Sequence, residues 1–315
     1  MALTNLKLFA GSSHPELASQ IAKELKTCVS DMKISKFACG ETYVRPDETV
    51  RGKDVYVVQT TTQNVNEDMM ELFIILDALK RSFARSIHVI MPYFAYARQD
   101  RVALPREPIS AKLMADLISS AGADHVITMT LHSDQEQGFF NFPVDNLISY
   151  KLLAKYFKKK NIKDLVVVSP DAGGAKDAKK FADELGADLA IIHKSRSPKK
   201  HNVSEVTHVV GDIEGKTCVL FDDMVDTGGS VVNGKEALIK NGAKKDIYLI
   251  ATHPVFSNDA AAKLKKAKFK EVVVTNTTPV PKNKQFPGLK IISIAPLLAK
   301  IIKNVQEHKS VTQLF

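Results

Sequence analysis

Short runs of apolar and β-branched residues recur along the whole chain and predict its strands. Longer stretches lie between most of these runs, and their apolar residues recur every three or four positions, as on one face of a helix. This alternation predicts an α/β fold whose sheets are mainly parallel and flanked by helices. The predicted strands are residues 6–9, 55–59, 87–91, 126–129, 165–169, 189–193, 219–221, 247–252 and 272–275. The predicted helices are residues 15–25, 67–82, 110–121, 147–159, 176–185, 231–241, 259–266 and 294–305.

A glycine marks the end of three predicted helices and suggests that the two halves of the chain are built alike. Gly122, Gly186 and Gly242 each stand where a helix gives way to a strand, a position that favours the left-handed backbone conformation. The chain has 315 residues, which exceeds one average domain. We therefore expect two similar α/β domains, residues 1–147 and 148–315.

Composition narrows the class of protein. Hydrophobic residues make up 44% of the chain, which is ample for packed cores, yet no apolar run approaches the roughly 20 residues of a membrane span. The first residues lack the basic and apolar regions of a signal peptide. Cys28, Cys39 and Cys218 are far apart without metal-binding spacing, so reduced thiols are the simplest interpretation. We expect a cytoplasmic protein that does not bind membranes.

A formal net charge of +9 raises the possibility of a nucleic-acid partner. However, the lysines cluster in helix-like stretches at 158–160 and 263–270, tryptophan is absent, and no aromatic residues alternate with them to stack bases. Solvated helix faces explain these lysines better. We expect no nucleic-acid binding, whereas a basic balance also suits an enzyme of polyphosphate substrates.

The loop after the predicted strand at 219–221 concentrates chemically active residues. Its glycines let backbone amides approach an anion, and the start of the next helix adds partial positive charge. Its carboxylates suit ribose hydroxyls or a hard cation. An ordinary turn with Asp and Ser as helix caps is the alternative. The loop contains three acids, two glycines and two hydroxyl residues: Asp222, Asp223, Asp226, Thr227, Gly228, Gly229 and Ser230.

Three other predicted strands, which end at residues 129, 169 and 193, lead into polar residues, and ligands bind at such ends in parallel sheets. The segment Asp171-Ala172-Gly173-Gly174 follows one strand, so its amides could approach a second phosphate while Asp171 reaches a metal; a capped, glycine-relaxed turn is an equal alternative. Lys194 and Arg196 follow another strand and would offset charge during phosphoryl transfer, unless they are a solvated basic turn. Residues 195–201 are expected to form a mobile lid.

The first half of the chain supplies weaker candidates. His132 follows the predicted strand at 126–129 and is either a metal or phosphate contact or a structural histidine. Residues 93–101 combine aromatic side chains, which could stack on a purine, with Arg98 and Arg101 for phosphates. Buried aromatics beside a surface arginine are the alternative. Residues 37–41 read as a turn.

Taken together, these segments resemble the ribose-phosphate diphosphokinase (phosphoribosyl diphosphate synthetase) family. The loop at 222–230 is also similar to the phosphoribosyl-diphosphate loop of the type I phosphoribosyltransferase fold. The resemblance implies two domains of that fold and transfer of the diphosphoryl group of ATP to the 1-hydroxyl of ribose 5-phosphate, leaving AMP. It further implies that the last segment, about 294–315, packs back on the first domain. The matching motifs are residues 9–14, 48–55, 96–101, 137–140, 143–146 and 310–315.

The family's roles then map onto this chain. The loop residues from Asp226 to Ser230 would hold the 5-phosphate, and Asp222 with Asp223 the ribose hydroxyls. Lys194 and Arg196 would stabilise the transition state, Asp171 to Gly174 would form the diphosphate loop, and His132 with Asp171 would hold Mg²⁺–ATP. ATP contacts are implied for Phe37, Cys39, Gly40, Glu41, Arg98, Gln99, Asp100 and Arg101.

The resemblance also implies assembly and regulation. It predicts a homo-oligomer built from dimers into a hexamer, with phosphate or ADP bound at a subunit interface near Thr49, Arg51, Ser310 and Thr312. A phosphoribosyltransferase is a competing interpretation, but it would carry one such domain and a base-binding hood. A catalytically weak or regulatory synthetase subunit is another. It is favoured only by Thr130, Asn141 and Cys39, where the family has acids or, at Cys39, a polar residue.

Neutral side chains at Thr130 and Asn141 should weaken the attraction for Mg²⁺, so we expect a raised Mg²⁺ requirement. The double substitution Thr130→Asp and Asn141→Asp should lower the half-saturating Mg²⁺ concentration by about threefold or more, because two added charges attract the ion. Titrating AMP formation with Mg²⁺ measures this. An unchanged Mg²⁺ dependence in the double variant would refute the idea.

Overall fold

A computed structural model of the chain describes residues 5–196 and 204–314. The chain divides into two compact units. Unit 1 comprises Met1–Ile148, Thr277–Pro279 and Ser293–Phe315, and unit 2 comprises Ser149–Asn276 and Val280–Ile292. The C-terminal helix therefore belongs to the unit that is formed mainly by the first half of the chain.

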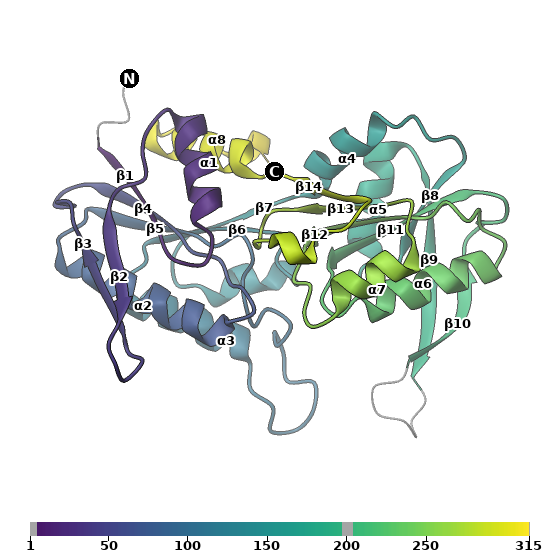
Figure 1. Cartoon of the computed structure of the whole chain (residues 1–315), viewed down its shortest axis with the longest axis horizontal. Coiled ribbons are helices and arrows are strands. Elements are labelled where there is room, and N and C mark those ends of the chain that lie inside the picture. The colour runs from purple at the N-terminus through teal and green to yellow at the C-terminus, as the bar shows by residue number, and fades with distance from the viewer. Residues whose placement is uncertain (1–4, 197–203, 315) are drawn as a thin grey trace. The chain divides into compact units, whose positions relative to one another are not determined.

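Unit 1 is built on a parallel sheet with the strand order β1-β4-β5-β6-β7 (Figure 1). Its strands are β1 (Leu6–Ala10), β4 (Asp54–Val58), β5 (Ser86–Ile90), β6 (His125–Met129) and β7 (Val144–Leu147). Its helices are α1 (Pro15–Leu25), α2 (Val65–Arg81), α3 (Ser110–Ala121) and α8 (Ala295–Gln306), with short 3₁₀ turns η1 (Asp134–Phe139) and η3 (Thr312–Leu314). An antiparallel hairpin, β2 (Met32–Lys36) and β3 (Thr42–Pro46), forms a separate small sheet.

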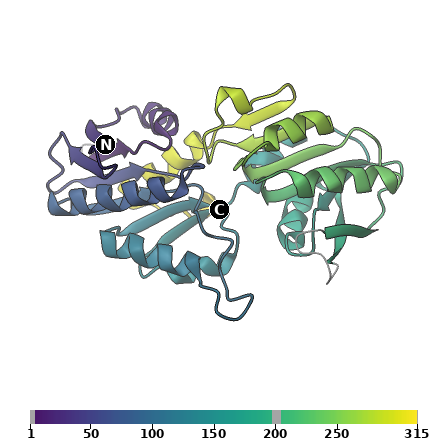
Figure 2. The same cartoon turned by 60° about the horizontal axis from the view of Figure 1, so that its bottom comes forward.

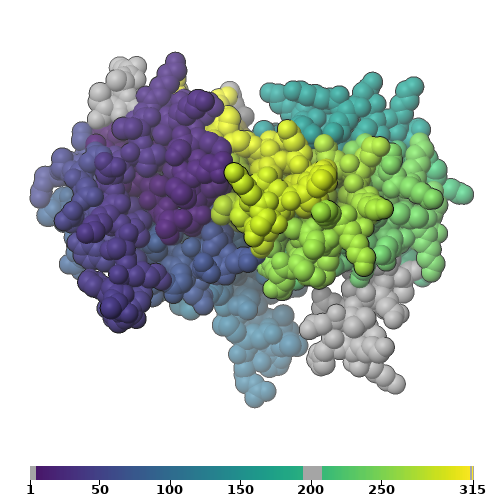
Figure 3. Space-filling model, in the orientation of Figure 1, coloured from purple at the N-terminus to yellow at the C-terminus, as the bar shows by residue number. Residues whose placement is uncertain are grey.

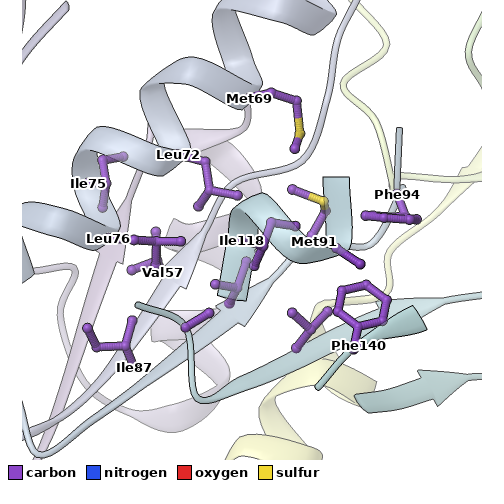
Figure 4. Packing of buried hydrophobic residues seen from close by; sticks show 14 of the residues in the cluster. Val57, Met69, Leu72, Ile75, Leu76, Ile87, Met91, Phe94, Ile118 and Phe140 are labelled. Atoms are coloured by element: carbon purple, nitrogen blue, oxygen red, sulfur yellow. The ribbon is translucent and has the colours of Figure 1, made fainter. Parts of the chain in front are cut away.

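Helices cover both faces of the unit 1 sheet because its strands are apolar on both sides, as parallel strands usually are. Helices α2 and α3 lie along one face, where Val57, Leu72 and Ile118 meet in a fully buried cluster (Figures 2 and 4). Helix α1 lies on the opposite face and packs against α8, so that purple N-terminal and yellow C-terminal atoms are neighbours (Figures 1 and 3). Segments from the two ends of the chain thus complete one layer.

Unit 2 repeats this architecture with the strand order β10-β9-β8-β11-β12-β13-β14, in which only β10 is antiparallel to its neighbour among the described strands. Helices α4 and α5 cover one face and α6 and α7 the other (Figure 1). The strands are β8 (Leu165–Ser169), β9 (Asp188–Arg196), β10 (Ser204–Val210), β11 (Thr217–Met224), β12 (Tyr248–His253), β13 (Glu271–Thr275) and β14 (Leu289–Ile292). The helices are α4 (Tyr150–Lys158), α5 (Ala175–Leu185), α6 (Gly229–Lys240), α7 (Ala260–Ala267) and the 3₁₀ turn η2 (Lys282–Lys284).

The structure confirms the predicted α/β class and the two similar, mainly parallel units. Gly122 and Gly186 end α3 and α5 in the left-handed conformation, with φ of 119° and 66°. Gly242, with φ of 87°, directly follows Asn241, the C-cap residue of α6. None of the helices within 5–196 and 204–314 combines the length and apolar character that crossing a membrane requires.

Several predicted boundaries were wrong because strand pairing overrides local pattern. The helix predicted from residue 147 begins at Tyr150, since Leu147 ends β7 and its carbonyl accepts a hydrogen bond from Thr130 N. The strand predicted at 219–221 continues to Met224, because β11 keeps its pairing with β12 as far as His253. Strands β2, β3, β7, β10 and β14 were not predicted; most are short, partly exposed edge or hairpin strands with little apolar signal.

Candidate functional site

Three neighbouring strands of unit 2 carry the strongest candidates. In the order β9-β8-β11 the strands run parallel, so their carboxyl ends meet at one edge of the sheet. The loop at Asp171 follows β8, Asp222 and Asp223 lie near the end of β11, and Lys194 and Arg196 lie near the end of β9. Segments that are far apart in sequence, such as those of Asp171 and Asp222, are thereby neighbours at one edge.

The turn between β11 and α6 has the form of an anion cradle. Gly228 precedes the helix with φ of 76°, a left-handed conformation that glycine adopts without strain. As the residue at the N-cap it has no side chain that could bond to the amides of the first turn. The N-cap position of α6 is thus held by a glycine and not by Asp or Ser. The helix extends over 12 residues, so its dipole adds positive potential at this end.

The β11 carboxylates are crowded. Asp222 and Asp223 lie inside the strand rather than after it, and Asp222 Oδ1 accepts a hydrogen bond from Asp223 N at 3.0 Å. Burial raises the pKa of Asp222 well above its usual range, and the charges of Asp223 and Asp171 raise it further. A ligand that brings positive charge or hydrogen-bond donors would relieve this repulsion.

The loop after β8 is closed by its own carboxylate. Asp171 Oδ1 accepts hydrogen bonds from Gly173 N at 3.0 Å and Gly174 N at 3.1 Å, while Ser169 Oγ donates to the Asp171 carbonyl at 2.7 Å. This is the capped turn that the sequence left open as an alternative. A phosphate that approached these two amides would compete with Asp171 for them. Released from the amides, the exposed Asp171 carboxylate would be available to a cation.

Lys194 and Arg196 belong to β9, which is longer than predicted and pairs with β10 through Arg196 opposite Ser204. The expected lid at 195–201 therefore begins inside the strand. The remainder of that segment, residues 197–201, lies outside the described residues, as do the side chains of Lys194 and Arg196.

The sequence did not single out the residues at the end of β12, although they support the turn between β11 and α6. The His253 carbonyl accepts from Val225 N at 2.9 Å, and His253 is buried beside β11. Thr252 shares a short hydroxyl contact of 2.5 Å with Ser149 at the base of the same sheet edge. The signal was available, because an apolar run ending in Thr-His resembles the other three strand ends.

In unit 1 the segment predicted to bind ATP, residues 93–101, begins with buried residues. Tyr93 and Phe94 are almost fully buried, and Phe94 packs on Phe140 with ring centroids 5.4 Å apart. They are therefore core residues, and the expected aromatic surface for a purine is wrong for this pair. Gln99 is exposed, but its side chain accepts a hydrogen bond from Ser110 Oγ, and its carbonyl accepts one from Ala111 N at 3.2 Å. Gln99 thus ties the segment of the exposed Arg98 and Arg101 and the half-buried Asp100 to the start of α3.

The Phe37 turn connects β2 to β3. Phe37 N donates to the Glu41 carbonyl and Gly40 N to the Phe37 carbonyl, both at 2.9 Å, with Gly40 at φ of 95°. Phe37 is 55% exposed and packs edge-on against Tyr43. Cys39 is also exposed, and its thiol is free. The hairpin presents an aromatic ring to its surroundings.

His132 stands in a rigid loop after β6. Leu131 N donates to Asn146 Oδ1 at 3.1 Å, and Ser133 with Glu136 forms a reciprocal capping box that starts η1. Thr130 adopts a left-handed φ of 47°, unusual for a β-branched residue. His132 is exposed at this strained turn.

The four residues expected near an effector site are exposed at the surface of unit 1: Thr49, Arg51, Ser310 and Thr312. The Arg51 guanidinium lies over the Phe83 ring, 4.5 Å from its centroid. Ser310 Oγ accepts from Thr312 N at 3.2 Å and so begins η3, while Asn304 holds the Ser310 carbonyl at 2.9 Å. Thr49 is exposed.

No group of three His, Cys, Asp or Glu side chains in the described parts of the chain is arranged to hold a metal ion by itself. The acids of unit 2 nevertheless fit Mg²⁺, which typically binds one or two carboxylates and completes its shell with substrate phosphates and water. Burial first, and then the neighbouring charges of Asp223 and Asp171, raise the pKa of Asp222, so three carboxyl groups gather at this place. The fit is thus to a cation that arrives with a phosphate substrate.

Comparisons with known proteins match nearly the whole chain. A family profile described as the N-terminal domain of ribose phosphate pyrophosphokinase matches residues 6–122, and one described as the phosphoribosyl synthetase-associated domain matches residues 201–315. The ribose-phosphate pyrophosphokinase of Oceanobacillus iheyensis is 48% identical over 99% of this chain and 98% of its own length. That of Bacillus subtilis is 46% identical over 99% and 97%, respectively.

A solved structure agrees with these matches. The phosphoribosylpyrophosphate synthetase from Mycobacterium smegmatis is 48% identical and superimposes with a TM-score of 0.91, covering 96% of this chain and 99% of that one. The similarity extends over both units, which excludes an architecture with a single domain of this kind.

The crowding of Asp222 predicts that the site is held at a cost in stability. In the unfolded chain Asp222 has an ordinary pKa and is ionised at neutral pH. In the folded chain its pKa is raised, so at neutral pH folding must either bury the charge or bind a proton, and either one costs free energy. Asp222→Asn should raise the free energy of unfolding at pH 7 by about 1–2 kcal/mol and abolish turnover. The gain should vanish below about pH 4, where the acid is protonated in both states.

Urea unfolding of the unliganded protein across this pH range measures the effect. Asp212→Asn is the control with the opposite sign, because Lys216 lowers the pKa of Asp212 and its loss should not stabilise the fold. Loss of stability in Asp222→Asn at pH 7 would contradict the prediction.

Proposed function

This chain belongs to the ribose-phosphate pyrophosphokinase family, and we propose that the adjoining ends of β9, β8 and β11 hold the reacting groups of its substrates. The family's reaction transfers the diphosphoryl group of ATP to the 1-hydroxyl of ribose 5-phosphate and yields phosphoribosyl diphosphate and AMP. The chain is an enzyme of this activity. The observation that carries the assignment of residues is the adjacency of the three strand ends in one parallel sheet.

Ribose 5-phosphate is assigned to the turn between β11 and α6. The uncapped amides at Gly228 and Gly229, with the hydroxyls of Thr227 and Ser230, suit the 5-phosphate at a helix N-terminus. The Asp222 and Asp223 carboxylates accept hydrogen bonds from the ribose hydroxyls. Because their charges repel one another, donors from a sugar relieve strain that already exists.

ATP is assigned to two sets of groups, each described within its own unit. In unit 1 they are the exposed Phe37 ring with Cys39, Gly40 and Glu41, and the segment Arg98 to Arg101 that Gln99 fixes to α3. In unit 2 the Asp171 to Gly174 loop receives the diphosphate portion, whose oxygens take over the two glycine amides from Asp171. This exchange releases the Asp171 carboxylate from these two amides.

Mg²⁺ is proposed as the cofactor, with His132 and Asp171 as its protein contacts. When bound, the ion neutralises phosphate charge and polarises the phosphorus that is attacked. Asp171 has the oxygen donors that Mg²⁺ prefers, whereas the imidazole of His132 suits a contact through phosphate or water better. The absence of a preformed cage within the described residues accords with an ion that is shared with ATP.

Lys194 and Arg196 are the proposed catalytic residues. They lie two positions apart in β9, next to the β8 loop in the sheet. Their positive charges would stabilise the negative charge that spreads over the transferring group in an in-line transition state. Positioning of the 1-hydroxyl by the β11 carboxylates supplies the remainder, and no covalent enzyme intermediate is needed.

Assembly and regulation are also proposed. A homo-oligomer, formed from dimers that associate into a hexamer, would give the exposed Phe37 hairpin a neighbouring subunit. Phosphate or ADP would bind around Thr49, Arg51, Ser310 and Thr312. Arg51 supports this assignment because its guanidinium is exposed on Phe83 and available to a phosphate.

Activity and the role of Lys194 are tested together. The purified protein should form AMP from ATP and ribose 5-phosphate with Mg²⁺, and Lys194→Ala should lower kcat by about 10³-fold or more, the effect of removing one preorganised transition-state contact. Lys265→Ala, an exposed lysine of α7, is the matched control and should retain full activity. Normal turnover by Lys194→Ala would remove this lysine from catalysis, whereas an inactive parent protein would favour the regulatory subunit.

The glycine turn gives a second test. Gly229→Ala places a methyl group in open space at the start of α6, where only Thr227 Oγ1 lies within 4 Å, at 3.9 Å. It should preserve or slightly raise stability, by up to about 1 kcal/mol, because alanine favours a helix. If the 5-phosphate binds these amides, the KM for ribose 5-phosphate should rise at least about tenfold, since the methyl group blocks close approach.

Gly228→Ala is the matched comparison. Its φ of 76° strains any other residue, so this variant should lose about 1–2 kcal/mol of stability as well as affinity for ribose 5-phosphate. Thermal unfolding and KM for each substrate separate the two effects. An unchanged KM for ribose 5-phosphate in Gly229→Ala would disprove the phosphate assignment.

A further inference from the structure

The loop between β12 and α7, residues 254–259, is hydrogen-bonded to the turn between β11 and α6 and has no role in the assignments above. Phe256 N donates to the Val225 carbonyl at 2.9 Å, and Ser257 N donates to the Asp226 carbonyl at 3.1 Å. Together with the bond from Val225 N to the end of β12, these contacts continue the pairing of β11 with β12 past both strand ends.

The start of α7 supports the other end of the same turn. A Cβ atom added to Gly228 would lie 3.7 Å from the Ala260 carbonyl oxygen and 3.8 Å from the Ala260 Cα atom, so the two backbones are in close proximity. Ala260 is fully buried, and its amide donates to the Ser257 carbonyl at 3.1 Å. The turn that we assign to the 5-phosphate therefore rests on residues 256–260 at both of its ends.

Phe256 is held in a backbone conformation that a bulky residue rarely adopts. Its φ is 46°, in the left-handed region, and Asn258 in the same loop has φ of 52°. The Phe256 side chain is buried in the same apolar cluster as Val225 and Val231. A strained residue keeps its conformation only where its surroundings fix it. The position of the Phe256 amide therefore depends on the contacts that hold this residue in place.

One of these contacts is made by an ammonium group. Lys284 Nζ donates to the Phe256 carbonyl at 2.6 Å, from a position 28 residues further along the chain. Lys284 is the last residue of η2 and is half-buried. A hydrogen bond from a charged donor is shorter and stronger than one between neutral groups. Lys284 thus fixes the carbonyl of a residue whose amide holds Val225.

We infer that Lys284 is a positioning residue for ribose 5-phosphate, which acts through Phe256 on the turn between β11 and α6. The inference rests on the assignment of the 5-phosphate to that turn. Phosphate binding at a helix N-terminus needs several backbone amides that point to one place. Gly228 and Gly229 give the turn conformational freedom, so the segment packed against it must supply the rigidity.

Two other roles for Lys284 predict different results. A lysine that only adds positive charge would attract the phosphate through space, and a neighbouring lysine would do the same. A lysine that only stabilises the fold would change thermal unfolding without favouring one substrate. The geometry favours positioning, because the ammonium group is engaged by a carbonyl oxygen of the loop that carries the turn.

The kinetic effect follows from the place of the 5-phosphate in the reaction. This group does not react, so its contacts are the same in the ground state and the transition state, and weakening them raises KM without lowering kcat. Lys284→Met keeps most of the aliphatic side chain and removes the ammonium group. Its KM for ribose 5-phosphate should rise about tenfold, the effect of losing one charged hydrogen bond. Its kcat and its KM for ATP should change by less than about twofold.

Three further variants serve as controls. Lys282→Met removes the same charge from an exposed position of the same 3₁₀ turn and should keep the KM of the parent protein. Lys235→Met removes a buried ammonium group that donates to the Ala267 carbonyl at 2.7 Å, at the far end of α7. It should lower the unfolding temperature without changing this KM. Lys284→Arg keeps a cationic donor and should restore most of the affinity.

Amide hydrogen exchange of the unliganded full chain measures the support of the turn without substrate. Mass spectrometry of peptides that cover residues 254–259 should show exchange about tenfold faster in Lys284→Met than in Lys282→Met, because the loop opens more often when its charged contact is lost. Equal exchange in the two variants would overturn the inference, whatever the kinetics show.

The kinetic outcomes separate this inference from the assignment of the phosphate. If Gly229→Ala raises the KM for ribose 5-phosphate and Lys284→Met does not, the assignment stands and Lys284 is not a positioning residue. An equal rise of this KM in Lys282→Met would show an effect of charge, and an equal rise in Lys235→Met an effect of destabilisation; either result would overturn the inference. If neither Gly229→Ala nor Lys284→Met changes this KM, the assignment of the turn fails, and the inference fails with it.

Discussion

Repulsion among carboxylates at the edge of the unit 2 sheet is the constraint on which the site depends. Parallel pairing of β9, β8 and β11 brings their carboxyl ends together, and with them Asp171, Asp222 and Asp223. The fold tolerates this because Asp171 is held by the amides of Gly173 and Gly174 until a ligand arrives. Under the proposed assignment, a phosphate and a cation would exchange these internal contacts for substrate contacts, so binding would relieve the repulsion that the sheet creates.

The two units share an architecture but treat their strand ends differently. In unit 1 the turn after β1 is closed by a buried side chain, since Glu71 accepts from both Ser12 N and Ser12 Oγ at 2.7 Å. In unit 2 the corresponding kind of turn, between β11 and α6, begins at Gly228 and has no side-chain cap. An internal carboxylate thus occupies in one unit the type of position that we assign to a substrate phosphate in the other. The two units therefore share a similar sheet, and the turns at their strand ends are what distinguish the structural role from the chemical one.

The pattern of apolar residues predicted helices and strands correctly where its period matches the face or faces that the element buries. Buried strands such as β4 and β8 are continuous apolar runs, and α1, α3 and α5 end at or within a residue of their predicted limits. It failed where pairing continues into polar residues, as β11 does through Asp222 and Asp223. It also misjudged Tyr93 and Phe94, since side chains in an aromatic and arginine-rich segment can point into a core or away from it.

The sequence by itself determined the α/β class, the glycine-ended helices and the polar residues that follow strands, because these depend on short-range periodicity and backbone freedom. Only the tertiary structure decided which strand ends are neighbours and that Asp171 caps its own loop. It alone aligned Tyr56, His88 and His125 across three strands. Such arrangements depend on strand order and register, which join residues far apart in the chain and leave no local periodic signal.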